Sequence, residues 1–527
     1  MDCEVSLRYG IVRRGVSFGV KIATVVAAVW MTSACLAQAP GEGSAQQDQN
    51  ANKPMTKEQA KELFKSVDEI LGFVSSDTKL PIVHSVKRKL ISRDEVTKYL
   101  QVKFDEDEGT KRMERSEIVL KKFGMLSRDF KLRPFLLSLL TEQIAGFYDN
   151  KTKTVNLLDW IQPDEQKPVL AHELTHALQD QKVDLTKWSE VSMDDVSHNV
   201  EQDNKHLQVD EVDTARTAVA EGQAMAVFVD YALRPTGRTI ADAPELAEKL
   251  KDSVSDMSGS PILARAPLLL QQSLLFPYDE GLNFEQQLLI KAGRDVAFAG
   301  VLMNPPSSSF EIMNPKAYME HVPVPVLRMP DIHPMIDADY VPYDVGVMGE
   351  LDVRMLTELF GGREMADGLA AAWNGGLYYA AQKKSATAEE KETTVSIALL
   401  YFSRWKNRDS ARSFLHVYSE QIPRQYSNVV ERKQDEKDDE LVYSTSEGDV
   451  LLSISGDDVF VSESFPLDLA RKLRDSIASV QGSGPIRVAD MYHEPVLDMA
   501  RTLGSFGVMR AAVVNGNRYT SEGQGLK

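Results

Sequence analysis

Two histidines and a glutamate in the segment Val169–Gln181 are the residues of this sequence best suited to chemistry. His172 and His176 are four positions apart, so on a helix both imidazoles project from the same face. Two nitrogens on one face suit a tetrahedral Zn²⁺ with bonds of about 2.1 Å. Glu173 is rotated by about 100° from His172, so its carboxylate can take a proton from a metal-activated water instead of binding the metal. The spacing therefore predicts metal-assisted hydrolysis.

A catalytic zinc site needs a third protein ligand and one open position. A third histidine six residues after His176 is excluded, because Lys182 occupies that position. Glu221 is the best candidate, since an ionised carboxylate among alanine and glycine residues is costly unless it is paired or metal-bound. Other interpretations stay open at this point. Glu221 could be solvated or form a salt bridge to Arg216, and the histidines could bond only to backbone or carboxylate groups.

These residues resemble the HExxH zinc peptidases, in the gluzincin branch whose third ligand is a downstream glutamate. The resemblance covers only about residues 142–230. The segment Glu142–Gln181 is also similar to uncharacterised bacterial envelope members of this class. The resemblance implies that the two histidines are ligands of one catalytic zinc ion, with Glu173 as general base and Glu221 as third ligand.

The fold implied by the resemblance places one antiparallel edge strand beside the active-site helix. Thr154–Leu158 has the sequence of a short strand and could pair there with an extended peptide substrate. The chain departs from the family pattern in two places. Glu221 lies 45 residues after the second histidine, which requires an insertion, and Met225 occupies the position of an aspartate that orients a histidine in some gluzincins. Asp180 and Asp213 are the alternative orienting residues.

A developing oxyanion usually needs a further hydrogen-bond donor. No spacing in the sequence selects this donor, and each candidate is more often a packed or surface residue. The candidates are Tyr148, His198, His206, Tyr278, His321 and His333.

The elements that must position these residues are expected to be mainly helical. Apolar residues recur at helical spacing over 57–140, a helix is expected over 164–181, and 210–233 has one apolar face. Residues 182–208 lack a strong period and indicate a surface excursion. The sequence therefore predicts an α+β fold in which a mainly helical, zincin-like body, residues 57–382, carries a small sheet.

A second α+β unit, a sandwich, is predicted for residues 393–480, after a polar linker. Its strands and helices follow the order β-α-β-β-β-α, with turns at Glu447-Gly448 and Gly456-Asp457-Asp458. This order favours a layered domain with its helices on one face of the sheet. Residues 481–527 form a tail whose pattern is ambiguous.

The N-terminal region predicts export. Basic residues precede an uncharged run from Ile22 to Ala39, as in a secretory signal. Cys35 follows small residues, as in a bacterial lipobox, and is the predicted lipidation site. Cleavage near Ala37 or Ala39 and an uncleaved anchor are the alternatives. Residues 1–39 are thus expected to be a signal segment and 40–56 a flexible tether, with the body held at the cell envelope by a lipid or an anchor.

The composition of the chain disfavours nucleic acids as partners and limits the residue types that could bind a metal. The 527 residues contain 60 Lys and Arg against 78 Asp and Glu, and the net charge of −18 disfavours nucleic-acid binding. With only two cysteines, a metal must be held by histidine and carboxylate. We expect an exported, membrane-tethered zinc peptidase that acts on peptides or proteins. The alternative is a non-catalytic envelope lipoprotein with a structural metal site and a partner-binding C-terminal domain.

Overall fold

The computed structural model describes residues 55–106, 109–189, 198–245 and 260–481. The predicted signal segment with Cys35, nearly all of the predicted tether and the tail from residue 482 lie outside the described residues. Among the helices in the described ranges, none is both long enough and apolar enough to span a membrane. The fold class is α+β, as the sequence predicts.

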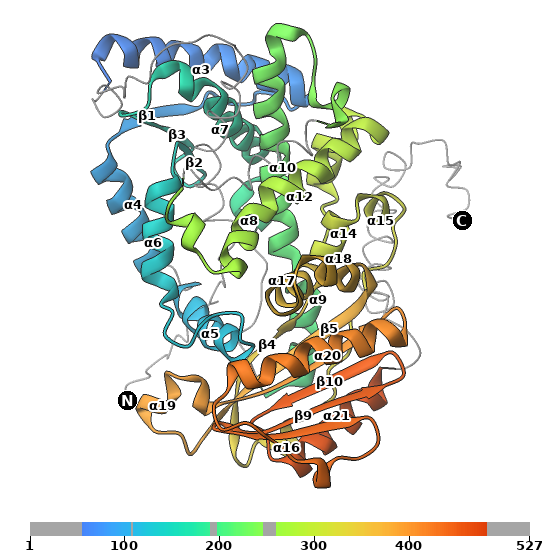
Figure 1. The fold of residues 1–527 in the computed structure, drawn as a ribbon. Helices are drawn as coiled ribbons and strands as arrows, with labels where there is room; N and C mark the ends of the chain where they lie inside the picture. The colour runs from blue at the N-terminus through green and yellow to red at the C-terminus, as the bar shows by residue number, and fades with distance from the viewer. Residues whose placement is uncertain (1–54, 107–108, 190–197, 246–259, 482–527) are drawn as a thin grey trace, which may run out of the picture.

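The first part of the described chain is mainly helical and forms most of the upper half of Figure 1, while α5 and α9 reach the sheet below it. Its longer helices are α3 (Lys57–Thr78), α4 (Arg93–Glu106), α5 (Gly109–Lys122), α6 (Leu132–Gln143), α7 (Pro163–Val183), α9 (Val200–Val209), α10 (Val212–Leu233) and α12 (Leu268–Ala292). The predicted surface excursion over 182–208 is partly helical, because it contains α8 (Leu185–Ser189) and α9, while 190–197 lie outside the described residues.

Shorter helical segments follow α10 and α12 and lead into the C-terminal sheet. They are η1 (Arg234–Thr236), η2 (Ile240–Asp242), η4 (Leu263–Arg265), the π-helical η5 (Val296–Gly300), α13 (Val301–Met303), α14 (Ser309–Met313), α15 (Pro315–Met319), α16 (His333–Ile336), α17 (Glu350–Gly361), α18 (Arg363–Ala372) and α19 (Ala388–Lys391). Serine side chains between α13 and α14 bond Glu211 and Glu311, so this connection is tied to the helical body.

A three-stranded sheet lies beside α7. Its strands are β1 (Lys87–Ile91), β2 (Phe147–Asp149) and β3 (Thr154–Leu158), in the order β1-β3-β2. β3 runs parallel to β1 and antiparallel to β2. The expectation that Thr154–Leu158 is an edge strand is therefore wrong, because β1 occupies its second side. The edge next to α7 belongs to β2.

Helix α7 carries the His-Glu-x-x-His motif through the middle of the helical body. Proline at its first position and the acidic residues Asp164 and Glu165 in its first turn favour a helix start there. The helix ends at Val183, and the next residue, Asp184, adopts a left-handed conformation with φ 52°. All residues from Val169 to Asp180 are buried, between α3, α10 and the small sheet. The polar side chains of this stretch must therefore find partners inside the protein.

Helices α10 and α12 cross in backbone contact next to Glu221. A Cβ atom on Gly222 would lie 2.2 Å from the carbonyl oxygen of Gly281. Conversely, a Cβ atom on Gly281 would lie 2.3 Å from the carbonyl oxygen of Ala218. Only glycine fits at these two positions, so the crossing fixes where α10 presents Glu221 to α7.

Gly222→Ala is expected to destabilise the protein, because the added methyl group meets a backbone carbonyl that cannot move aside. Overpacking of this kind costs about 1–3 kcal/mol. Thermal unfolding would show it as a lower melting temperature. Gly72→Ala in α3 is the control, since no atom lies within 4 Å of the added methyl group. There the higher helix propensity of alanine should stabilise the protein by up to about 1 kcal/mol. Equal effects of the two substitutions would contradict the crossing geometry.

A separate seven-stranded antiparallel sheet forms the lower part of Figure 1, in the order β4-β5-β6-β10-β9-β8-β7. Its strands are β4 (Tyr340–Val347), β5 (Trp373–Lys383), β6 (Ile397–Trp405), β7 (Val430–Glu431), β8 (Glu440–Thr445), β9 (Gly448–Ser455) and β10 (Asp458–Glu463). Helices α20 (Arg408–Gln425) and α21 (Leu467–Val480) complete the predicted strand and helix order, with β7 in addition. The sheet also includes β4 and β5, which precede residue 393.

The two helices of this unit pack on opposite faces of the sheet, so the expectation of helices on one face is wrong. Phe414 of α20 shares a core cluster with Leu452 of β9, whereas Leu473 of α21 shares another with the adjacent Leu451. Adjacent strand residues point to opposite faces. Strand β6 is buried at all nine positions, as expected for a strand covered on both sides.

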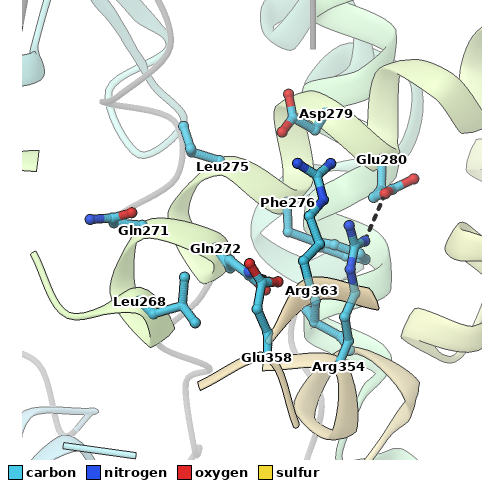
Figure 2. A pocket seen from close by; sticks show the side chains of 11 residues that line it. Leu268, Gln271, Gln272, Leu275, Phe276, Asp279, Glu280, Arg354, Glu358 and Arg363 are labelled. Carbon is cyan, nitrogen blue, oxygen red and sulfur yellow. Dashed lines mark hydrogen bonds and ion pairs between the residues drawn. The ribbon is translucent and has the colours of Figure 1, made fainter. Parts of the chain in front are cut away.

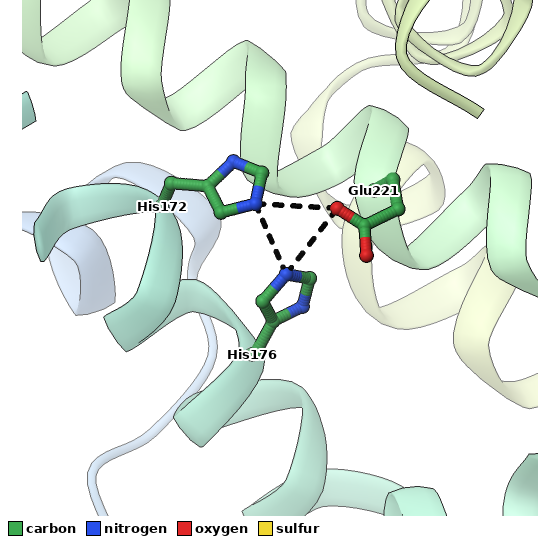
Figure 3. Close-up of side chains that lie close together, drawn as sticks. All are labelled: His172, His176 and Glu221. Atoms are coloured by element: carbon green, nitrogen blue, oxygen red, sulfur yellow. Dashed lines mark hydrogen bonds and ion pairs between the residues drawn. The ribbon is translucent and has the colours of Figure 1, made fainter. Parts of the chain in front are cut away.

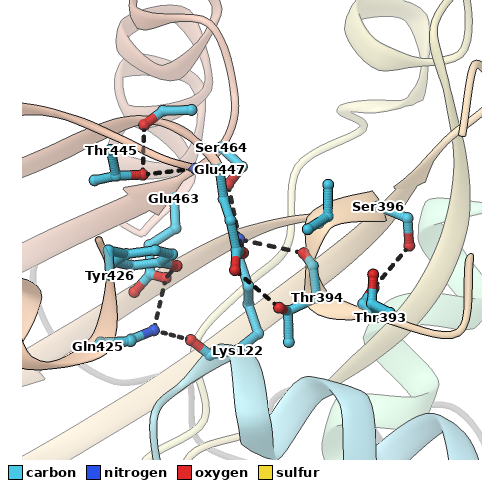
Figure 4. Close-up of polar contacts among 12 residues, drawn as sticks. Lys122, Thr393, Thr394, Ser396, Gln425, Tyr426, Thr445, Glu447, Glu463 and Ser464 are labelled. Carbon is cyan, nitrogen blue, oxygen red and sulfur yellow. Dashed lines mark hydrogen bonds and ion pairs between the residues drawn. The ribbon is translucent and has the colours of Figure 1, made fainter. Parts of the chain in front are cut away.

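A buried charged network joins the helical body to this sheet (Figure 4). Lys122, the last residue of α5, is fully buried, and its Nζ lies 2.8 Å from Glu447 Oε2 and 2.7 Å from Ser464 Oγ. Tyr418 and Tyr426 donate hydrogen bonds to the neighbouring carboxylate of Glu463. Burial acts to lower the pKa of Lys122, but the carboxylates oppose this effect. Lys122 and Glu447 thus form an ion pair across the two units, which ties the helical body to the sheet.

Candidate metal centre

His172, His176 and Glu221 come together at the crossing of α7 and α10 (Figure 3). The two Nε2 atoms lie 3.2 Å apart, and Glu221 Oε2 lies 3.2 Å from Nε2 of His172 and 3.5 Å from Nε2 of His176. Each of the three residues is at most 2% exposed. The three predicted ligands are thus brought together, although 45 residues separate Glu221 from His176.

The spacing of these atoms fits a single metal ion. Ligand atoms about 2.1 Å from a tetrahedral ion lie about 3.4 Å from one another, which is close to the three separations observed. Two imidazole nitrogens and one carboxylate oxygen are also a donor set that divalent transition metals prefer. The cluster could therefore hold a metal ion, and it is the only group of this kind among the described residues.

The negative charge of Glu221 favours a positive charge between the three ligand side chains. Burial acts to raise the pKa of Glu221, but the two histidines outweigh it and hold this pKa at about 2. Burial acts to lower the pKa of His176, but the Glu221 carboxylate outweighs it and raises this pKa to about 9. Burial lowers the pKa of His172. A proton or a metal ion can supply the positive charge between these groups, and metal binding displaces the proton.

Glu173 lies beside the ligands and is held by the edge strand. Its Oε2 accepts a hydrogen bond of 2.7 Å from the backbone N–H of Tyr148 in β2. Burial raises the pKa of Glu173 to about 8, with His176 and the Tyr148 N–H acting in the opposite direction. Gly146 lets the backbone before β2 approach α7, since a Cβ there would lie 3.2 Å from Val169 Cγ1. Glu173 is therefore positioned by a main-chain group that no residue type in the sequence reveals.

Gln179 orients one of the histidines, a role that the sequence analysis missed. His176 Nδ1 lies 2.8 Å from Gln179 Oε1, and Gln179 is fully buried. The signal in the sequence is an amide three residues after a histidine, which places both side chains on the same helical face. The expected orienting residue Asp180 instead accepts hydrogen bonds from Tyr148 Oη at 2.7 Å and Lys153 Nζ at 2.7 Å.

Asp213 and Arg216, which the sequence suggests as an orienting residue and as an ion-pair partner of Glu221, both lie on α10. Asp213 is buried in the first turn of α10, eight residues or about 12 Å along the helix axis before Glu221. Arg216 donates a hydrogen bond to the carbonyl of Trp188, and its guanidinium lies 5.6 Å from the centre of that indole ring. The salt bridge from Glu221 to Arg216 is therefore not formed.

The six candidate oxyanion donors lie in different parts of the fold. Tyr148 Oη bonds Asp180, as described above. The three histidines lie near α9 and the sheet. His198 Nδ1 is 3.0 Å from Asp337, His333 Nδ1 is 3.0 Å from Asp331, and His206 Nε2 is 3.4 Å from Asp210. Of the remaining two, Tyr278 is buried on α12 and His321 is exposed after α15.

A pocket of about 170 Å³ lies elsewhere, between α12, α17 and α18 (Figure 2). Arg354 and Arg363 point from α17 and α18 toward the carboxylates of α12, and Arg354 lies 3.1 Å from Glu280. Gln272 donates a hydrogen bond of 2.6 Å to Glu358. The pocket contains none of the predicted metal ligands.

Comparison of the chain with protein-family models, with curated proteins and with solved structures finds no match.

Proposed function

We propose that this protein is a zinc-dependent peptidase of the HExxH class, with the glutamate ligand set of the gluzincins. The observation that carries the proposal is the convergence of His172, His176 and Glu221 within 3.5 Å, with Glu173 beside them on the helix that carries the two histidines. Three protein ligands leave a fourth tetrahedral position for water, which a closed structural site does not have. A structural site also has no use for a carboxylate next to its first histidine.

The residues of this chain would divide the work as follows. His172, His176 and Glu221 hold the metal, and a zinc ion bound there would supply Lewis-acid activation of water and of the substrate carbonyl. Glu173 takes the proton of the attacking water and passes it to the leaving amine. The Tyr148 N–H bonds one oxygen of Glu173, so the other oxygen is free to face the water. Burial of the whole group strengthens these electrostatic interactions.

An extended peptide would dock along the edge of β2 that does not pair with β3. The Tyr148 N–H on this edge is bonded to Glu173, and the carbonyl oxygen of the same residue lies on the same side of this antiparallel pair, where it can accept from a peptide. A peptide paired with this edge would pass directly beside Glu173. Strand addition of this kind is a common mode of peptide recognition. The substrate strand thus belongs to Phe147–Asp149 rather than to Thr154–Leu158.

We also propose that the enzyme is exported and held at the bacterial cell envelope. The support comes from the sequence alone: basic residues, an uncharged run and Cys35 after small residues. A lipid on Cys35 would leave residues 40–56 as the tether between membrane and body.

Removal of the metal tests the proposed activity. Purified full-length protein should hydrolyse a casein or quenched fluorescent peptide mixture, and dialysis against a chelator should abolish this activity. Addition of one equivalent of zinc should restore it, because the ligand set remains folded around a small buried site. Activity that survives complete zinc removal, verified by elemental analysis, would contradict the proposal.

A further inference from the structure

The hydrogen-bond partners of Gln179 allow only one orientation of its amide. Its Nε2 donates to the carbonyl oxygen of Ala220 at 3.0 Å and to Gln223 Oε1 at 2.9 Å. An amide nitrogen carries two hydrogens and no acceptor, whereas the amide oxygen only accepts. Both hydrogens of Nε2 are thus used by oxygen atoms, and Oε1 must be the atom that faces His176.

Gln223 on α10 is held in the same way from its other end. It is fully buried, and its Nε2 donates to the carbonyl oxygens of Ala297 at 2.8 Å and Phe298 at 3.1 Å. Both carbonyls belong to the π-helical turn η5. A main-chain carbonyl can only accept, so these two groups force Gln223 to present its oxygen to Gln179. The direction of every bond in the chain from η5 to His176 follows from them.

We propose that this chain of two glutamines sets the tautomer of His176 for metal binding. Because Gln179 Oε1 can only accept, His176 Nδ1 must carry the hydrogen, and the lone pair of the neutral ring lies on Nε2. Nε2 is the atom that faces Glu221 and His172. Gln223 is thus a positioning residue for the metal, although it contacts neither histidine. The inference rests on the proposed metal site but not on hydrolysis.

The chain of two glutamines, called the relay below, takes the place of a feature of the family pattern that this protein lacks. Met225 stands where some gluzincins carry the orienting aspartate, and its thioether cannot take that role. A neutral amide achieves the same orientation without adding a buried negative charge. The carbonyl oxygens of η5, a turn in a third helical segment, fix the orientation of the Gln223 amide and through it that of Gln179. The ligand helix α7, the glutamate helix α10 and η5 therefore cooperate in preparing one nitrogen atom.

Gln223→Met tests the relay with zinc affinity as the readout. Methionine keeps the length of the side chain but neither donates to the η5 carbonyls nor accepts from Gln179. Zinc affinity of the full-length protein, measured by competition with a chelating dye, should fall about 10–100-fold, as for loss of an outer-shell partner. Gln179→Met should lower it similarly, and the double variant should be no worse than Gln179→Met, because both substitutions break one chain.

Gln286→Met is the matched control. Gln286 is buried on α12 and likewise donates from Nε2 to two carbonyls, those of Ile240 and Ala243, away from the metal ligands. It should cost similar stability and leave zinc affinity unchanged. Should Gln223→Met not fold, Gln223→Leu likewise removes both the two donated hydrogens and the oxygen that accepts from Gln179. Wild-type affinity in the folded Gln223 variant, or an equal loss in Gln286→Met, would overturn the relay. A wild-type chain that binds no zinc would instead contradict the proposed function.

Discussion

Glu173→Gln is expected to lower the turnover of peptide hydrolysis by about 10²–10⁴-fold while one zinc ion stays bound. Glutamine has the shape of glutamate but cannot accept a proton from water. The Tyr148 N–H needs an acceptor at 2.7 Å, so the amide oxygen should take the place of Oε2 and the amide nitrogen should face the reaction site. The measurement is kcat on a quenched fluorescent peptide, together with the zinc content of the same sample.

Glu165→Gln is the control for this experiment. Glu165 lies in the first turn of the same helix, is exposed, and has no place near the ligands. Its substitution should change neither zinc content nor kcat. Wild-type hydrolysis by the Glu173 variant would exclude Glu173 as the base. Absence of hydrolysis in the wild-type protein, with zinc bound, would favour the non-catalytic alternative in which the metal only stabilises the body.

The parts of the site that local periodicity governs were predictable from the sequence. The placing of His172 and His176 on one face follows from 3.6 residues per turn, and the predicted helix over 164–181 is α7 in the structure. Glu221 could be found because an ionisable group among alanine and glycine requires a compensating partner. Its contact with the histidines depends on the crossing of two helices, which the sequence suggests only through its small residues.

The parts that depend on distant pairing were not predictable. The segment Lys87–Ile91 reads KRKLI, has no alternation of apolar and polar residues, and forms a strand only because it pairs in parallel with β3. This pairing turned the expected edge strand into a central one. The helices α20 and α21 lie on opposite faces because β6, β9 and β10 are apolar on both faces, and element order alone does not reveal this.

The second-sphere residues illustrate the same limit of local reasoning. Gln179 and Gln223 are ordinary amides in the sequence, and only their partners give them a direction. The carbonyls of η5 lie more than 70 residues after Gln223. A buried amide on a helix that carries metal ligands is nevertheless a usable signal, because its cost must be offset by a hydrogen-bond network.

Glu221→Gln is expected to weaken zinc binding by more than the roughly 10–100-fold that loss of an outer-shell partner costs. The variant keeps an oxygen in place but removes the negative charge that the cation requires, since the two histidines contribute none. The same charge raises the pKa of His176 to about 9 in the metal-free site. Zinc affinity by chelator competition and peptide hydrolysis should therefore fall together, and excess zinc should restore part of the activity.

Glu285→Gln provides a matched comparison for the loss of a buried carboxyl group. Glu285 is fully buried on α12, and burial raises its pKa well above the usual range, which disfavours its charged form. This variant should keep wild-type zinc affinity and gain stability at alkaline pH. A Glu221 variant that binds zinc as tightly as the Glu285 variant would show that the third ligand lies elsewhere. In that case the observed convergence on Glu221 would be an ion pair with two histidines, and the metal centre would need a different carboxylate.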